Sequence, residues 1–538
     1  MSHYLSLRIF TVIFSLMLCS FAALGETINR LPQQLSQLPE VIDSALETFY
    51  TPGMAVGIIK DGKVVYLAGH GKRDLANDLP VTPETYFRLA STTKAFTGAS
   101  VAMLVDDGKL QWRDRVTRYL PEFAMQDPWV TREFQIIDLL THRSGLVSGA
   151  GDSMLWPEPS GFTRSEIIHN LRYLTPQSSF RSDYAYSNVM YITAGELVAS
   201  ISDQPWEEFV AKRIFAPLDM SCFAGDMPPE KLTNAAVSYG HNDKRGIYPV
   251  VRNQIGVTGI VSAAAGGIAC NATDMLKWVQ MWLNKGKSPD GNQLLTDKSI
   301  DTMLSAHTVL SVDDTDKEWD HTLFKAYGIG WRLSDVFGHQ VISHTGTLSG
   351  YQAYVAFVPD ISAGVVILNN GSNYGARGAV MQTILKGYLT AEQPQQNWIK
   401  QYQVYQDKQE QIYLSKHSTP QGSGTVILPL EKYTGTFEDR WFGQVEVTQQ
   451  GDKLRLKAKK MPTLRGSLEP FDDHTFVVRW DNQNAASDAF AHFRVNTQRE
   501  VIAVDFYPFT DKVKANHEYR DMHFIRMEAG SGVTSVTP

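Results

Sequence analysis

The sequence predicts an α+β domain, in which helices flank an antiparallel sheet, followed by a small all-β barrel domain. Three patterns indicate this: β-prone runs shortly after residue 50 and again after residue 325, mainly helical periodicity between 110 and 285, and short alternating segments beyond 424. Because a sheet and its helices share one apolar core, the early and late strands are expected to join a single sheet. The 538 residues, 43% hydrophobic and 20% charged, are ample for both domains.

The first 25 residues have the pattern of a secretory signal peptide. Arg8 precedes a mostly apolar run over 9–24, and Ala23-Leu24-Gly25 offers small residues at the two positions that a signal peptidase reads. We therefore expect cleavage before Glu26, a periplasmic or secreted protein, and no stable membrane insertion afterwards. The alternative is an uncleaved anchor, although about 16 apolar residues are short for a membrane span.

Composition excludes several other functions. A formal net charge of −7 and a pI near 6.1 give no basic surface for nucleic acid. Only Cys222 and Cys270 remain after cleavage; export permits a disulfide, but the sequence does not establish their pairing or redox state. Without a C-x-x-C pair or clustered His and Cys, we expect no metal and no cofactor. The segment 286–288 resembles the end of a phosphate-binding loop, but Met281 stands where that loop needs its first glycine.

The first structural elements of the chain are a hairpin and a central helix. The runs 54–59 and 64–68 flank Asp61-Gly62, a strong signal for a tight turn, and predict neighbouring antiparallel strands. Residues 91–106 predict a helix that is apolar nearly all round, which is typical of a buried helix. The start of this helix is therefore expected at a buried position.

Later segments repeat the two kinds of pattern. Apolar residues recur at helical spacing in 136–140, 164–172, 191–201, 206–214 and 273–282. Strands are predicted at 327–333, 339–342, 352–358 and 364–368. Pro359-Asp360 is a turn signal, so the last two strands are expected to pair as a hairpin.

A change of composition separates the second domain from the first. Residues 391–416 predict a polar connecting helix, and the Pro/Gly/Ser-rich stretch 418–424 predicts a domain boundary. The expected units are therefore 26–390, a linker over 391–424, a β-barrel over 425–527 and a disordered tail over 528–538. Strands of the barrel are predicted at 444–448, 453–458, 475–480, 491–495 and 501–507.

Ser91 and Lys94 form a candidate catalytic pair at the start of the central helix. Residues three apart lie on one face of a helix, so hydroxyl and amine would be neighbours. A serine needs a group that takes its proton, and a lysine does so when burial depresses its pKa from about 10.4. The pair alone is weak evidence, because about two such pairs occur by chance in a chain of this length.

Two later motifs support the pair. Tyr186 and Asn188 form the only Tyr-x-Asn of the chain, and His344-Thr345-Gly346 follows. In this order and at these separations, the three motifs resemble those of the penicillin-recognising serine hydrolases: class C β-lactamases, DD-peptidases, and their esterase and D-aminopeptidase relatives. The segments 139–146 and 265–275 are similar to the same family. The resemblance covers roughly 35–390 and implies the β-lactamase/DD-peptidase-like fold; residues 433–437 resemble the opening of a lipocalin-like β-domain.

The resemblance and the chemistry together assign the roles. Ser91 would attack a carbonyl and form an acyl-enzyme, while Lys94 and Tyr186 would move its proton. A tyrosine beside an ammonium ionises more easily, so the two are expected to share one proton, and the formal base stays open between them. The backbone N–H groups of Ser91 and Thr347 would hold the oxyanion. Asn188 would bind the substrate amide or position the lysine.

The remaining residues of these segments are interpreted separately. Substrate binding is assigned to His344, Gly346 and Thr347, but His344 departs from the lysine usual in class C β-lactamases and DD-peptidases. A histidine is mostly neutral at pH 7, so weaker recognition of a substrate carboxylate is expected. For His142 we expect a structural hydrogen bond, with catalysis as the alternative, and Arg143 is assigned no role.

The predicted function is an exported serine hydrolase of a small peptide, ester or amide substrate, in the D-aminopeptidase or esterase branch. The alternatives are a β-lactamase or DD-carboxypeptidase and, in another class, a non-catalytic sensor of cell-wall ligands. The barrel could be a lid, a ligand-binding module or a dimerisation surface. The natural substrate and the oligomeric state are not predicted from the sequence.

Overall fold

The fold was analysed in a computed structural model that describes residues 31–250, 255–256, 259–390, 396–417, 419–481, 488–509 and 519–528. The expected signal peptide lies outside the described residues, and so do all but the first residue of the expected tail, 528–538. Among the described residues, none of the helices has the length and apolar character needed to cross a membrane.

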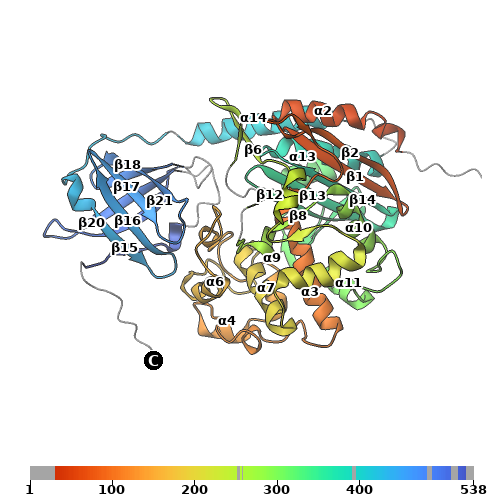
Figure 1. Ribbon diagram of the computed structural model, residues 1–538, viewed down its shortest axis with the longest axis horizontal. Coiled ribbons are helices and arrows are strands. Elements are labelled where there is room, and N and C mark those ends of the chain that lie inside the picture. The colour runs from red at the N-terminus through yellow and green to blue at the C-terminus, as the bar shows by residue number, and fades with distance from the viewer. Residues whose placement is uncertain are drawn as a thin grey trace, which may run out of the picture.

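A nine-stranded antiparallel sheet forms the centre of the first domain (Figure 1). Its spatial order is β3-β2-β1-β14-β13-β12-β11-β10-β9. The strands are β1 (Gly53–Lys60), β2 (Lys63–Asp74), β3 (Leu79–Pro80), β9 (Thr308–Leu310), β10 (Lys325–Tyr327), β11 (Arg332–Val336), β12 (His339–Leu348), β13 (Tyr351–Val358) and β14 (Ala363–Asn369). The first and last long strands, β1 and β14, pair directly, which confirms that early and late strands share one sheet.

Helices cover both faces of this sheet. One face packs against α2 (Leu38–Thr48), α12 (Asp314–Asp320), α13 (Tyr374–Leu389) and α14 (Trp398–Lys416) through a separate apolar cluster. The other face belongs to the main core and holds the remaining helices, which include the buried α3. They are α3 (Lys94–Asp106), α4 (Pro128–Glu133), α5 (Ile136–Leu140), α6 (Arg164–Asn170), α7 (Asn188–Ser202), α8 (Trp206–Val210), α9 (Ala263–Gly266), α10 (Ala272–Leu283) and α11 (Asp297–Met303). The α+β fold class is therefore confirmed.

Two turns bear out the sequence signals that predicted them. Asp61 and Gly62 both have positive φ, 51° and 74°, which is the type I′ geometry that suits a two-residue hairpin between β1 and β2. Pro359 opens the connection between β13 and β14, which pair as an antiparallel hairpin. Both hairpins are confirmed.

The prediction of one continuous strand over 327–333 is wrong. The chain reverses there, so that β10 ends at Tyr327 and β11 begins at Arg332. Gly330 makes the reversal possible: its φ is +75°, and a Cβ there would lie 2.6 Å from the Ala95 Cα, so the turn fits directly against α3. The strand predicted to end at 342 is also too short, since β12 runs to Leu348 and contains the His344 motif.

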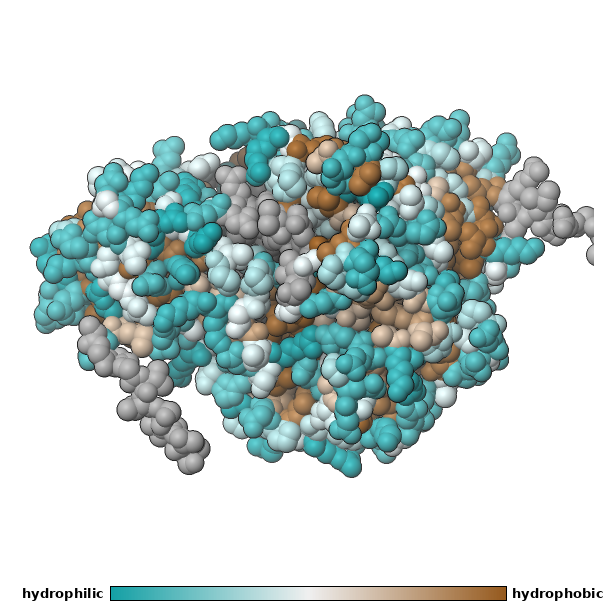
Figure 2. All heavy atoms as spheres, viewed as in Figure 1, coloured by the Kyte–Doolittle hydropathy of each residue, from teal (hydrophilic) through white to brown (hydrophobic). Residues whose placement is uncertain are grey.

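The C-terminal domain is a closed eight-stranded antiparallel barrel. Its strands are β15 (Gly435–Asp439), β16 (Gly443–Gln450), β17 (Lys453–Ala458), β18 (Arg465–Asp472), β19 (Thr475–Trp480), β20 (Ala489–Val495), β21 (Val501–Pro508) and β22 (Phe524–Arg526). Buried side chains such as Phe437, Leu456 and Phe493 fill it, whereas hydrophilic residues cover most of the face of the barrel drawn in Figure 2. The sequence did not predict β15, β18 and β22.

The barrel contacts the segment 161–170 of the first domain. The Gly161 N–H donates to the Lys460 carbonyl over 2.6 Å, and the Asn170 Nδ2 donates to the Trp441 carbonyl over 2.7 Å. The Lys460 ammonium pairs with the Glu166 carboxylate. The two domains thus meet through hydrogen bonds, one ion pair and the apolar side chains around them.

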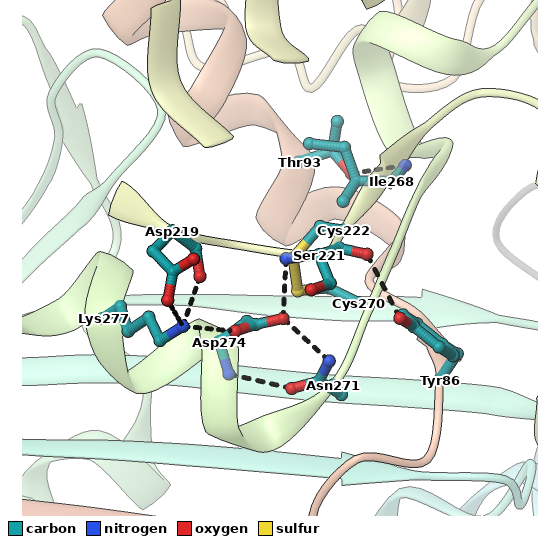
Figure 3. The surroundings of a disulfide bond; sticks show 10 residues. All are labelled: Tyr86, Thr93, Asp219, Ser221, Cys222, Ile268, Cys270, Asn271, Asp274 and Lys277. Atoms are coloured by element: carbon teal, nitrogen blue, oxygen red, sulfur yellow. Dashed lines mark hydrogen bonds and ion pairs between the residues drawn. A yellow bond between two sulfur atoms is a disulfide. The ribbon is translucent and has the colours of Figure 1, made fainter. Parts of the chain in front are cut away.

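A disulfide joins Cys222 and Cys270, the pairing that the sequence left open. It ties the strand β5 (Phe223–Ala224) to its partner β8 (Ile268–Cys270), in a small sheet that also holds β4 (Phe87–Arg88). Figure 3 shows the Asp274 carboxylate beside it, which accepts from the Ser221 N–H over 2.8 Å. Cys270 of the disulfide pairs with Phe87 of β4, and β4 is the strand that leads to Ser91.

Removal of this disulfide is expected to destabilise the protein by about 4 kcal/mol, the loop-closure entropy for its spacing. The spacing is 48 residues. The measurement is urea unfolding of the oxidised wild type and of the double variant Cys222→Ser/Cys270→Ser. An unchanged free energy of unfolding, or two alkylatable thiols in the unreduced wild type, would contradict it.

Candidate active site

The candidate nucleophile lies where a short strand turns into the central helix. After β4 the chain forms a 3-10 turn over Ala90–Thr93, and α3 begins at Lys94. Ser91 is thus in the 3-10 turn and not in the first turn of the predicted α-helix. The spacing still brings the pair together, since the Lys94 Nζ lies 3.3 Å from the Ser91 Oγ.

Lys94 is fully buried, and its amine has two other acceptors. The Nζ donates to the Asn188 Oδ1 over 2.7 Å and to the Ala265 carbonyl over 2.8 Å. Burial lowers the pKa of Lys94 to about 7, Asp152 opposes this shift, and Arg332 adds to it. A neutral amine would use its two N–H groups on these acceptors, which leaves its lone pair for the hydroxyl of Ser91.

Tyr186 reaches the nucleophile from a loop that is pinned at its backbone. The Tyr186 N–H donates to the Ser148 Oγ over 3.0 Å, and its carbonyl accepts from the Gly149 N–H over 2.9 Å. The phenol then donates to the Ser91 Oγ over 2.6 Å. Asn188 follows two residues later as the first residue of α7, with Ser187 as its N-cap, so one segment delivers both side chains.

The expectation that the Tyr186 phenol ionises easily is wrong. Burial raises its pKa well above the usual range, and the nearby Tyr184 adds to the rise. The Lys94 Nζ lies over the ring face, 4.7 Å from the centroid, and not against the phenolic oxygen. Desolvation of a phenolate therefore outweighs the cation, and the phenol stays neutral near pH 7.

The β12 motif packs directly against the nucleophile turn. A Cβ at Gly346 would lie 2.1 Å from the Leu89 carbonyl oxygen, so a glycine is needed for β12 to approach so closely. Thr347 is the next residue and is exposed, with its hydroxyl 3.0 Å from the Arg377 Nη1. The same guanidinium donates to the Gly346 carbonyl over 2.7 Å. Arg377 therefore holds the peptide whose N–H belongs to Thr347.

His344 lies inside the protein, with its side chain buried. Its Nδ1 donates to the Thr345 carbonyl over 2.7 Å, so its Nε2 accepts from the Tyr327 hydroxyl at 3.0 Å. Burial lowers its pKa well below the usual range, which keeps the ring neutral. Both ring nitrogens are occupied, so the ring offers no nitrogen to a substrate.

His142 makes the structural hydrogen bond expected of it. Its Nδ1 accepts from the Ser187 N–H over 3.0 Å, directly at the N-cap of α7. Arg143, assigned no role from the sequence, donates to the Asp138 carboxylate over 3.1 Å, and Arg181 binds the same carboxylate. These contacts fix the loop that carries Tyr186.

The chain was compared with profiles of known protein families. A profile of the beta-lactamase family matches residues 40–386, which contain all the site residues described above. The chain belongs to the beta-lactamase family. A second profile, for a domain of unknown function named DUF3471, matches residues 420–526 and thus the barrel.

Similarity to individual proteins extends over much of the chain. An unguisins hydrolase of Aspergillus campestris is 27% identical over 480 residues, 85% of this chain and 86% of the relative. Penicillin-binding protein 4 of Amycolatopsis lactamdurans is 26% identical over 62% of this chain and 84% of the relative. The structure of an octameric penicillin-binding protein homologue from Pyrococcus abyssi has a TM-score of 0.58 at 21% identity, covering 91% of this chain and all of that one.

The sequence motifs of the beta-lactamase family did not reveal two charged residues of the site. Arg332 on β11 donates to the Thr345 Oγ1 over 3.1 Å and lies 3.4 Å from the Tyr184 hydroxyl. It has no carboxylate within ion-pair distance among the described residues. Asp152 binds the Asn188 amide from the other side, over 2.9 Å. The positions of Arg332 and Asp152 in the site depend on strand pairing and loop packing, which a local sequence pattern does not predict.

Proposed function

We propose that the protein is an exported serine hydrolase that cleaves an amide or ester bond through a Ser91 acyl-enzyme. The observation that carries the proposal is the contact of the Ser91 Oγ with both a low-pKa amine, Lys94, and a neutral phenol, Tyr186. Of the two, the buried lysine is the base, because the phenolate is too costly at neutral pH.

The proton balance follows from the same contacts. Neutral Lys94 takes the hydroxyl proton of Ser91 as the oxygen bonds to the substrate carbonyl carbon. The leaving amine or alkoxide then receives that proton from the Lys94 ammonium, which returns the lysine to its neutral form, while the Tyr186 hydroxyl keeps its own proton and its hydrogen bond to the Ser91 Oγ. A water molecule then hydrolyses the acyl-serine with the lysine again as base, and the carboxylate product leaves.

The amide or ester substrate is supported by the relatives and by the site. The name of the Aspergillus campestris relative describes a hydrolase, and that similarity spans most of both chains. A neutral, buried His344 in place of a cation supports the D-aminopeptidase or esterase branch. A non-catalytic sensor is disfavoured because Ser91, Lys94 and Tyr186 are all in contact.

A second candidate function, β-lactamase or DD-carboxypeptidase, is favoured by Arg332. This guanidinium supplies a permanent positive charge near the site and lacks a carboxylate partner among the described residues, as a subsite for a substrate carboxylate requires. Replacement by Met is then expected to raise KM for a D-Ala-D-Ala peptide about tenfold or more, with little effect on a neutral ester. Arg332→Lys, which keeps a charge, is the matched control; equal effects on both substrates would contradict carboxylate recognition.

A substrate panel tests the proposed function as a whole. It comprises short p-nitrophenyl esters, D- and L-amino-acid amides, D-Ala-D-Ala peptides and nitrocefin, each with wild type and Ser91→Ala. Hydrolysis that depends on Ser91 is expected for an ester or amide. Wild type no faster than Ser91→Ala on every substrate would favour the sensor, and strong nitrocefin turnover would favour the β-lactamase.

Export is proposed from the signal pattern, and a Cys222–Cys270 disulfide agrees with an oxidising compartment. The intact mass of protein recovered from the periplasm or medium tests it. A chain that begins at Glu26 is expected, and one that retains residues 1–25 would contradict cleavage.

A further inference from the structure

Asp152 is a buried acid next to the candidate catalytic groups, and neither the sequence motifs nor the proposed reaction assigns it a role. It opens a short 3-10 turn, Asp152–Met154, directly after Gly151, which has a φ of 80°. Its Oδ2 accepts from the Asn188 Nδ2 over 2.9 Å. Its Oδ1 is buried and has no hydrogen-bond partner among the described residues. Burial of a carboxylate with an unpartnered oxygen is costly, so its presence requires an explanation.

The Asn188 amide connects this acid to the nucleophile. Its Oδ1 accepts from the Lys94 Nζ, and its Nδ2 donates to Asp152. Because an ionised carboxylate only accepts hydrogen bonds, it dictates which way the amide faces. A reversed amide would present its NH₂ group to the lysine and its oxygen to the carboxylate. The acid therefore holds the amide in the orientation that serves Lys94.

The charge of Asp152 acts on the same lysine. The other titratable or charged groups facing the pair come from β10, β11, β12, the loop after α5, the 184–186 loop and α7. They are Tyr327, Arg332, His344, His142, Tyr184, Tyr186 and Tyr191. Burial keeps both histidines neutral, so Arg332 is the cation that acts on the lysine among these described residues. Asp152 is the one carboxylate among them, and its negative charge offsets Arg332.

We infer that Asp152 is a positioning residue of the hydrolase: it orients the Asn188 amide toward Lys94 and supplies the negative charge that governs how much of the lysine is protonated. The inference rests on the proposed function, because it concerns the base of that reaction. Lys94 and Asp152 can share one proton in two ways, as ammonium with carboxylate or as amine with carboxylic acid. The second form has a free amine and no charged group, which suits a buried site.

The direction of the pH effect follows. Burial raises the pKa of Asp152 to about 7, close to that of Lys94, so the two titrate as a coupled pair. The anionic form of Asp152 raises the pKa of Lys94. Without that anion the lysine loses its proton at lower pH. The acid limb, which is the low-pH rise of kcat/KM in the pH profile, then moves to lower pH.

The test compares Asp152→Asn with wild type in the full-length protein. The acid limb of kcat/KM for a p-nitrophenyl ester is expected to shift down by about one pH unit, since one unit is the size of a modest charge interaction. At pH 8 kcat/KM is expected to fall at least tenfold, because the Asn188 amide loses its fixed direction. Ser153→Ala changes the adjacent buried hydroxyl, which also lacks a partner, and is expected to leave the profile at the wild-type position.

Two results would overturn the inference. One is a rate that falls equally at every pH with the acid limb unmoved, as loss of packing alone predicts. The other concerns Asp152→Glu, which keeps the charge and also serves as the test if the Asn variant does not fold. The acid limb of this variant is expected to stay near that of wild type, and a shift as large as that of Asp152→Asn would overturn the inference. Absence of Ser91-dependent hydrolysis in wild type would instead refute the proposed function, so the two failures are distinguishable.

Discussion

Ser91→Ala is expected to lower kcat/KM for every substrate of the enzyme by about 10⁴-fold or more, because it removes the oxygen proposed to bond to the carbonyl carbon. The folded state should persist, since Ser91 is only partly buried and α3 keeps its apolar contacts. The measurement is steady-state hydrolysis of the best ester or amide of the panel. Substrate binding is expected to remain, as no other side chain of the site changes.

The control for this variant lies on the same helix. Ser100 of α3 is buried and donates to the Phe96 carbonyl over 2.8 Å, away from the contacts of Ser91. Ser100→Ala is expected to change stability slightly and to retain the wild-type rate. A Ser91→Ala variant that keeps more than about a tenth of the wild-type rate would contradict the assignment of the nucleophile.

Lys94→Met is expected to lower kcat/KM by about 10³-fold, the usual worth of a positioned base. In the proposed mechanism the amine must be neutral to accept the serine proton, and burial lowers its pKa to about 7. The wild-type kcat/KM should therefore rise with pH through about 7 and level off above it. The variant should lack this rise, because the group that titrates is gone.

Lys386 provides the matched control for a buried lysine. It lies on α13, 2.6 Å from the Asp320 Oδ1, and burial lowers its pKa as well. Lys386→Met is expected to reduce stability while it leaves the acid limb in place. A Lys94→Met variant that retains the wild-type acid limb would show that another group, such as Tyr186, acts as the base.

Much of the fold could be predicted from local patterns, because hairpin turns and apolar periodicity are local. Asp61-Gly62 indicated the first hairpin, and the apolar body of 91–106 indicated the central helix. The reversal at Gly330 was missed because it depends on contact with α3, which is distant in the chain. Three barrel strands were missed for a similar reason: their pairing, and not their composition, defines them.

In the candidate site, too, motifs predicted some features, whereas features that depend on tertiary packing were missed. The family motifs predicted the residues whose side chains meet at Ser91, namely Lys94 and Tyr186. They did not predict that the phenol resists ionisation, since that depends on how deeply tertiary packing buries it. Asp152 and Arg332 were missed because each reaches the site through a loop or a paired strand.

Trapping the acyl-enzyme tests whether Ser91 is the nucleophile. Wild type and Ser91→Ala are mixed with a p-nitrophenyl ester, quenched in acid within the first turnover, digested and mapped by mass spectrometry. A burst of p-nitrophenol and an acyl mass on the peptide that contains Ser91 are expected in wild type, and both should be absent from the variant. An acyl group on a different residue, or turnover with no covalent adduct under any quench time, would contradict Ser91 as the nucleophile.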